Sequence, residues 1–294
     1  MGESRTDRKR AMQQALDGNE SQFRFRPENK RLLAQDIFNA VLGLLAIIAL
    51  WWFVAELMIY IRGAAFPTPP EVFNAFWQAL LGAEVNGRSI FAHTESSLYR
   101  WGLGYLIASV LGLALGMAFG TMARLHDVGM VAVHILQMIP GLAWIPIAML
   151  MFGLGEAATV FIIAVTAFPP IALNTAGGIR QVPELHARVA RMSGLDGGRV
   201  FLHVLLPGAA LSIINGLRVG LANGWRVLIA AEMVVGVAVG LGYSIYQSRY
   251  NLDFTAAFVS IMVICAIGLT IEKVLFTTLE NKLRNRLGVD REDL

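Results

Sequence analysis

The chain has 294 residues, of which 56% are hydrophobic and 15% are charged, and its mean hydropathy is +0.58. A soluble globular domain has about 45–50% apolar and about 25% charged residues, so this composition excludes an ordinary soluble domain and predicts membrane-spanning segments. The single cysteine, Cys265, excludes a disulfide framework and a multi-cysteine metal site. The formal net charge is +3, but the basic residues flank apolar runs, so they indicate membrane orientation rather than a nucleic-acid partner.

The apolar segments predict an all-α bundle of about six transmembrane helices. A bilayer core about 30 Å thick needs roughly 20 apolar residues in a helix. Strands are excluded for these segments, because an open sheet edge in lipid leaves backbone groups unpaired. Residues 1–36 form a polar, basic tail ahead of the first segment, which is too long for a signal-peptide core and is expected to be retained. The six segments are 37–61, 98–120, 128–152, 156–176, 209–238 and 254–279.

The basic residues predict the orientation of these helices. With the N-terminus in the cytoplasm, 18 Lys and Arg residues fall on the cytoplasmic side. The outer side holds four, which are Arg62, Arg88, Arg100 and Arg249. Because basic residues gather on the cytoplasmic side of membrane proteins, both termini are expected there. The loop over residues 62–97 is then outside.

The outer loop over residues 62–97 contains the sequence FPTPPEVFNAFWQAL. Its apolar residues recur at helical spacing, so we expect an amphipathic helix along the outer membrane surface. The residues that carry the pattern are Val72, Phe73, Phe76 and Leu80.

Glycines and prolines mark the middle of the chain. Small residues four apart let helix backbones approach closely, and packing within one subunit is preferred here to a dimer or gate interface. The glycines are Gly112, Gly116 and Gly120 in the second segment and Gly216, Gly220 and Gly224 in the fifth. Pro140 and Pro146 each remove a hydrogen bond from the third segment and promote a kink, which suits either a gate or a static bundle.

The loop over residues 177–208 is the only sizeable cytoplasmic loop between predicted helices. An amphipathic helix is expected from Glu184 to Gly194, with its acid near the positive end of the helix dipole. Its apolar residues recur at i, i+4 and i+7, and they are Leu185, Val189 and Met192. The pair Leu206 and Pro207 is expected to open the next spanning helix. These residues alone suit either a surface connection or the contact with a cytosolic partner.

Three charged residues, Arg218, Arg226 and Glu232, lie within the fifth segment. A charge at the bilayer centre costs about 2.5–3.5 kcal/mol on insertion scales, so each should face protein or water. Arg218 and Glu232 project to similar sides, but they lie about 21 Å apart along a helix and cannot pair. Arg226 and Glu232 either line a path for an anionic substrate, together with Arg218 and Trp225, or have structural partners on neighbouring helices.

Other chemistry finds no support in the sequence. His126 and His134 lack the spacing of metal ligands, so no metal site is expected. No G-x-x-x-x-G-K-[ST] motif is present, so the chain cannot hold ATP phosphates by that route. Ser109 and Ser260 lie in spans without the motif of an intramembrane enzyme.

The loop over residues 177–208 resembles the "EAA" motif of ABC importer permeases. Gly194 takes the position of the motif glycine, Val204 that of its isoleucine, and Leu206 and Pro207 that of its Leu-Pro pair. The Glu-Ala-Ala positions hold Arg188, Val189 and Ala190, of which only the last matches. Longer segments resemble permeases for taurine, aliphatic sulfonates, nitrate and bicarbonate over residues 66–285. They are HTESSLYRWGLGYLIASVLGLALGMAFG, IPGLAWIPIAMLMFGLG, AFPPIALNTAGGIRQVP and INGLRVGLANGWRVLIAAEMVVG.

The resemblance implies a type I ABC importer transmembrane fold in a bacterial inner membrane. It implies a homodimer with two cytosolic ATPases that hold ATP and Mg²⁺, and an extracytoplasmic substrate-binding protein. The helix from Glu184 would be the coupling helix in an ATPase groove, and the chain itself would bind no cofactor and catalyse nothing. The expected regions are the tail 1–36, the first helix and outer loop 37–92, the permease domain 93–281 and a cytoplasmic tail 282–294.

The expected substrate is a small anion of the sulfonate, taurine, nitrate and bicarbonate class. Two alternatives stay open. One is ABC import of an uncharged vitamin precursor, and the other is an autonomous secondary transporter or channel, which would have a self-contained path.

Overall fold

The computed structural model describes residues 30–63 and 66–276, and the chain divides into two compact units, residues 1–64 and 65–294. The predicted C-terminal tail and most of the predicted N-terminal tail therefore lie outside the described residues. In the first unit, the described residues form one long helix, α2 (Lys30–Arg62), over the first predicted span.

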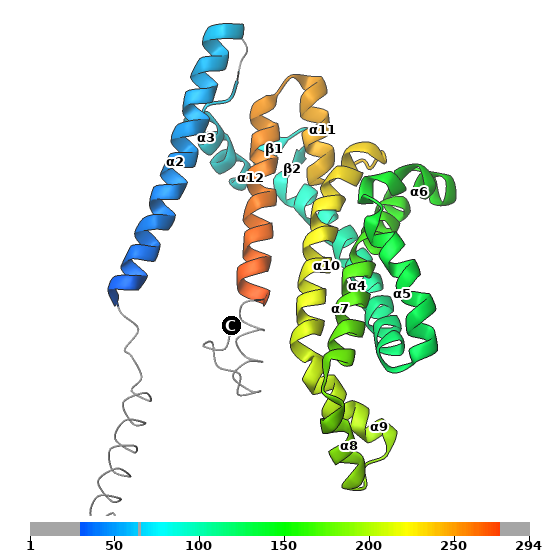
Figure 1. Ribbon diagram of the computed structural model, residues 1–294. Coiled ribbons are helices and arrows are strands. Elements are labelled where there is room, and N and C mark those ends of the chain that lie inside the picture. The colour runs from blue at the N-terminus through cyan, green and yellow to red at the C-terminus, as the bar shows by residue number, and fades with distance from the viewer. Residues whose placement is uncertain (1–29, 64–65, 277–294) are drawn as a thin grey trace, which may run out of the picture. The chain divides into compact units, whose positions relative to one another are not determined.

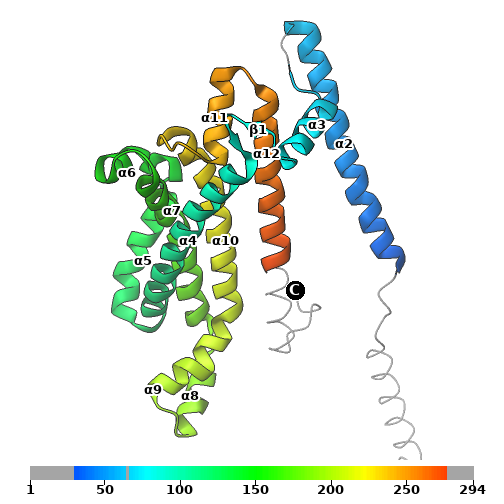
Figure 2. The same cartoon turned by 180° about the vertical axis from the view of Figure 1, so that it is seen from behind.

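The described part of the second unit is a helical bundle with one small hairpin. Figure 1 shows α8 at one end of this unit and α11 with the hairpin at the other, and Figure 2 shows the same arrangement from behind. The outer part of the chain contributes α3 (Pro69–Leu80), β1 (Glu84–Val85) and β2 (Arg88–Ser89). The bundle helices are α4 (Ile90–Thr121), α5 (Ala123–Met138), η1 (Gly141–Trp144), α6 (Ile145–Phe152), α7 (Glu156–Gln181), α10 (Leu206–Val234), α11 (Leu241–Asn251), α12 (Phe254–Thr270) and η3 (Ile271–Phe276). Between α7 and α10 lie α8 (Glu184–Met192), α9 (Gly197–Val200) and η2 (Phe201–Leu205).

Within the described ranges, five helical runs are long and apolar enough to cross a membrane. They are Phe38–Arg62, Ile90–Thr121, Glu156–Gln181, Gly197–Val234 and Phe254–Lys273. Helix α5 and the segment Gly141–Phe152 form a sixth span if they are taken together, and they are bent by 99° relative to each other. The helical fold class is confirmed.

The prediction of one third span over residues 128–152 needs a correction. Helix α5 ends at Met138, and Ile139 is extended with φ −78° and ψ 120°. The residue before a proline is pushed out of the helical region, so Pro140 causes the break. Pro146 does not kink the chain, because it lies in the first turn of α6, where its missing N–H has no helical partner to lose.

Helix α7 forms the centre of the bundle, between α4 and α10. A Cβ atom added at Gly112 or Gly116 would come within 2.8 or 2.6 Å of side-chain atoms of α7. On the opposite side of the core, a Cβ at Gly220 of α10 would lie 2.8 Å from the carbonyl oxygen of Ala167 in α7. Both sets of glycines therefore pack against a helix of the same chain, as expected for packing within one subunit.

The hairpin β1–β2 was not predicted from the sequence, because strands were considered there only as possible membrane spans. Its turn residues Asn86 and Gly87 both have positive φ, 53° and 79°, as a type I′ turn requires. The amide Nδ2 of Asn86 donates to the Oγ atoms of Ser244 and Ser248, at 3.0 and 2.9 Å. These bonds fix the hairpin to α11. The dipeptide Asn-Gly was the available signal.

The predicted outer amphipathic stretch forms α3. Thr68 and Glu71 make a capping box, with the Glu71 carboxylate accepting from the Thr68 N–H at 3.0 Å. Val72 and Ala79 are buried, whereas Phe73 and Leu80 are exposed. One face of α3 thus packs on the bundle and another remains open.

Candidate functional site

Helix α8 lies at the end of the second unit that carries the loop between α7 and α10 (Figure 1). Glu184 is in its first turn and Arg191 is in its last turn, so each charge lies at the helix end where it interacts favourably with the helix dipole. Gly194 follows the helix with φ +87°, and its N–H donates to the carbonyl of Arg191 at 3.0 Å. A left-handed glycine at this position is a common helix end, which explains the stop.

The face of α8 that carries its large apolar residues is open. Leu185, Val189 and Met192 are 67%, 53% and 87% exposed. Ala187 is buried and attaches the helix to the rest of the unit. Contiguous exposed apolar side chains are typical of surfaces that bind another molecule.

Arg188 occupies the position where the EAA motif has glutamate, and it pairs with Glu184. The Nη2 atom of Arg188 donates to Glu184 Oε2 at 2.8 Å, and both side chains are exposed. The hydrogen bond from Arg188 lowers the pKa of the Glu184 carboxyl below its ordinary value. At this position an arginine therefore stands in place of the motif glutamate, and it forms an ion pair with Glu184 one helical turn earlier.

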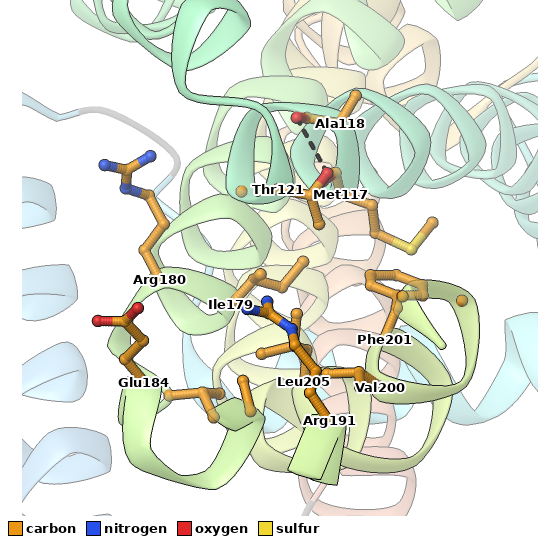
Figure 3. Close-up of a pocket in the computed structure, with 15 residues that line it drawn as sticks. Met117, Ala118, Thr121, Ile179, Arg180, Glu184, Arg191, Val200, Phe201 and Leu205 are labelled. Atoms are coloured by element: carbon orange, nitrogen blue, oxygen red, sulfur yellow. Dashed lines mark hydrogen bonds between the residues drawn. The ribbon is translucent and has the colours of Figure 1, made fainter. Parts of the chain in front are cut away.

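A cavity of about 650 Å³ lies beside α8, between that helix and the ends of α4 and α7 (Figure 3). Its lining includes Arg180, Glu184 and Arg191, together with apolar groups such as Ile179 and Phe201. The cavity therefore lies where α8 approaches the ends of α4 and α7.

The helix that follows this loop begins earlier than expected. Leu206 and Pro207 open α10 with proline in the first turn, as predicted, but α9 and η2 precede them in one helical run, Gly197–Val234. Asp196 caps this run by accepting the N–H of Arg199 at 2.8 Å. Val204 lies in η2, one turn before Pro207.

A buried polar network lies at the opposite end of α10, around Glu232, whose exposed fraction is 1%. Arg100 of α4 donates from Nη1 to Glu232 Oε1 at 2.6 Å. The Ser97 hydroxyl contacts both carboxylate oxygens at 2.9 Å, and the Gly242 N–H donates to Oε2 at 2.9 Å. Of the two alternatives for Glu232, the structure places this residue in a structural pair with a neighbouring helix.

The network also holds the chain between α10 and α11. Arg100 donates from Nη2 to the carbonyl of Val239 at 2.7 Å and lies 3.3 Å from Glu156 Oε1. The N–H of Gly240 donates to His93 Nδ1 at 3.1 Å, so the second ring nitrogen carries the proton and donates to the carbonyl of Val85 at 3.0 Å. Helices α4, α10 and α11 and strand β1 therefore meet at one buried centre.

Counting Arg100 among the outer-loop residues was wrong, because it lies inside α4 and its side chain is 3% exposed. Ser97 and His93 were not predicted from the sequence to belong to a site. Arg100 lies within the apolar segment 98–120, so an arginine that needs a buried partner was the available signal.

The other residues of α10 predicted to line the path lie away from this network. Arg218 pairs with Glu272 at 3.1 Å from its Nη2 to Oε1, near the end of α12. Arg226 is exposed and donates to Asn223 Oδ1 at 3.4 Å on its own helix. Trp225 is buried and packs edge-on against Trp101, with ring centroids 5.6 Å apart. Arg218, Trp225 and Arg226 line one small cavity, and Glu232 lies outside it.

Residues 96–285 match the family model of the binding-protein-dependent transport system inner membrane component. The chain belongs to this family. It is the membrane-spanning permease subunit of an ATP-driven importer and a multi-pass inner membrane protein. Family membership implies an ATPase and a substrate-binding protein as partners.

Similar proteins agree with this assignment of the permease. Over 189 residues it is 35% identical to the bicarbonate transport system permease protein CmpB of Synechococcus elongatus, covering 63% of this chain and 67% of that protein. It is 27% identical to the nitrate import permease protein NrtB of Synechocystis, covering 84% and 92%. A solved structure of the MetNI methionine ABC transporter, inward facing, superposes with a TM-score of 0.56 at 20% identity, over 64% of this permease and 93% of that chain.

Proposed function

We propose that this permease imports a small oxyanion of the bicarbonate, nitrate, taurine and sulfonate class. The observation that carries the proposal is its similarity to a bicarbonate and a nitrate permease over most of the bundle. The electrostatics of α10 supports it, because two arginines and one glutamate line a cavity inside the apolar part of the chain. A site with net positive charge in low dielectric favours an anion over a cation.

The proposed assembly is a homodimer with two cytosolic ATPases and a binding protein outside. We assign α8 as the helix that inserts into the ATPase, on the basis of its exposed Leu185, Val189 and Met192. ATP and Mg²⁺ are held by the ATPase, and the permease supplies the path and no chemistry. Closure of the ATPases moves α8 and switches the bundle between two states.

The proposed orientation places both termini and α8 in the cytoplasm and the hairpin outside. With Arg100 removed from the outer count, 18 basic residues on the cytoplasmic side stand against three outside. The proposed permease domain is 93–281, preceded by the first helix and outer loop at 37–92.

The substrate class is tested with the binding protein and the ATPase that assemble with this permease. The purified binding protein is titrated with bicarbonate, nitrate and taurine, and uptake of each is measured in proteoliposomes that contain the whole complex. We expect binding and uptake of at least one of these anions. Import of an uncharged heterocycle, with none of the three anions bound, would contradict the proposed class.

A further inference from the structure

A cavity of about 160 Å³ lies beside α10, the end of α12 and the start of η3. Ligand pockets for drug-sized molecules have volumes of about 300–1,000 Å³, so this cavity suits only an ion or a very small molecule. Helix α12 comes close to α10 at Gly268, where an added Cβ would lie 3.2 Å from Trp225 Nε1. A side chain at this position would narrow the cavity.

The indole N–H of Trp225 is a buried donor without a partner in the part of the chain that the structure describes. The residue is 7% exposed, and its ring is held by the edge-on contact with Trp101. Trp225 and Gly268 both line the cavity. Buried polar groups almost always have a hydrogen-bond partner, so an unpaired donor beside a cavity indicates an absent acceptor.

The two arginines of the cavity differ in their surroundings. Arg218 is paired with Glu272, which also lines the cavity. Arg226 takes part in none of the ion pairs formed among the described residues, and its hydrogen-bond acceptor there is the neutral amide of Asn223. The cavity therefore has one positive charge in excess of its carboxylate. A charge within a spanning helix must face water or a counter-charge.

We propose that this cavity is a binding site for the transported oxyanion within the permease. Arg226 donates two parallel hydrogen bonds to two anion oxygens, the geometry that a guanidinium offers to carboxylate-like groups. The Nε1 atom of Trp225 donates to a third oxygen. The Arg218–Glu272 pair bounds the site at the other end. This inference rests on the proposed function, because it places the proposed substrate at named donors.

The test compares variants in proteoliposomes that contain permease, ATPase and binding protein, with labelled bicarbonate, nitrate and taurine as probes. Arg226→Gln removes the charge, Arg226→Lys keeps it without the planar fork, and Trp225→Phe keeps the ring without the N–H. Matched controls are Arg62→Gln and Trp77→Phe, which change exposed residues of α2 and α3. Melting temperature and ATP hydrolysis are measured for each complex.

For the anion that the unaltered complex imports, we expect Arg226→Gln to lower the maximal uptake rate about tenfold to a hundredfold, as loss of a hydrogen bond to a charged group implies. Trp225→Phe should lower uptake about three- to tenfold, and Arg226→Lys should retain intermediate uptake. Melting temperatures and ATP hydrolysis should match those of the two controls.

The outcomes separate this inference from the proposed function. Normal uptake in both Arg226→Gln and Trp225→Phe would overturn the site while leaving anion import intact. A fall in melting temperature or failure of assembly in both variants would also overturn it, because both residues would then be structural. If the unaltered complex imports none of the three anions, the proposed function fails and the site falls with it.

Discussion

The buried pair Arg100–Glu232 gives the sharpest test of the structure. Glu232→Gln replaces one carboxylate oxygen by an NH₂ group. The carboxylate accepts from Arg100, Ser97 and Gly242, so the new group must face a donor on at least one side. Arg100 is then buried without its strongest counter-charge, since its second carboxylate, Glu156, is 65% exposed and 3.3 Å away.

Removing one partner of a buried ion pair costs about 3–5 kcal/mol. In a chain of this size, 1 kcal/mol corresponds to roughly 2–4 °C in melting temperature, so Glu232→Gln should lower it by roughly 6–20 °C. The assay is thermal unfolding of the purified permease in detergent. The matched control is Glu95→Gln, an exposed glutamate of the same part of α4, which should change the melting temperature by less than about 2 °C.

A double variant checks the mechanism of this loss. Arg100→Met with Glu232→Leu removes both buried charges, so the charge left without its partner is the exposed Glu156, and part of the lost stability should return. A melting temperature for Glu232→Gln equal to that of Glu95→Gln would refute the reasoning, because Glu232 could not then be the buried partner of Arg100.

The remaining predictions concern helix packing, the α8 surface and its ion pair. Gly116→Ala should destabilise the permease by about 1–3 kcal/mol, because the new Cβ would lie 2.6 Å from Thr175, whereas Gly102→Ala in the same helix meets no atom within 4 Å and should be neutral in thermal unfolding. Val189→Asp should leave the melting temperature unchanged and abolish co-purification of the ATPase, since this side chain is exposed on α8; retained co-purification and ATP-driven uptake would contradict the assignment of α8. Because Arg188 lowers the pKa of Glu184, their pairing is complete above the ordinary pKa of glutamate and is lost as pH falls through the lowered value. Arg188→Ala should therefore raise the pKa of Glu184, as measured by NMR titration, and an unchanged pKa would show that the ion pair is not formed in solution.

Local patterns in the sequence predict most of the fold. Five apolar runs of sufficient length form helices that overlap the expected segments, because a spanning helix satisfies its own backbone hydrogen bonds, but the runs Ile90–Thr121 and Gly197–Val234 begin earlier than expected. The helix that begins at Glu184 is also predicted by nearby residues, because its first turn is acidic and Gly194 follows its last turn. Pro140 indicated a distortion, but the size of the bend, 99°, depends on how η1 packs in the bundle.

Long-range contacts could not be predicted from the sequence. The partner of Glu232 lies 132 residues away in Arg100, and Asn86 reaches Ser244 across 158 residues. The glycine stripes predicted close helix approach without identifying α7 as the common neighbour of α4 and α10. Such pairings depend on tertiary packing, which no periodicity within one segment encodes.

The permease is one part of an importer that ATP drives. The most direct measurement is accumulation of labelled bicarbonate, nitrate or taurine against its gradient in proteoliposomes, with and without the partner ATPase. We predict accumulation of at least one anion only when the ATPase, the binding protein and ATP are all present. Equal accumulation by the permease alone would contradict the dependence on a partner ATPase, because the chain would then be an autonomous transporter.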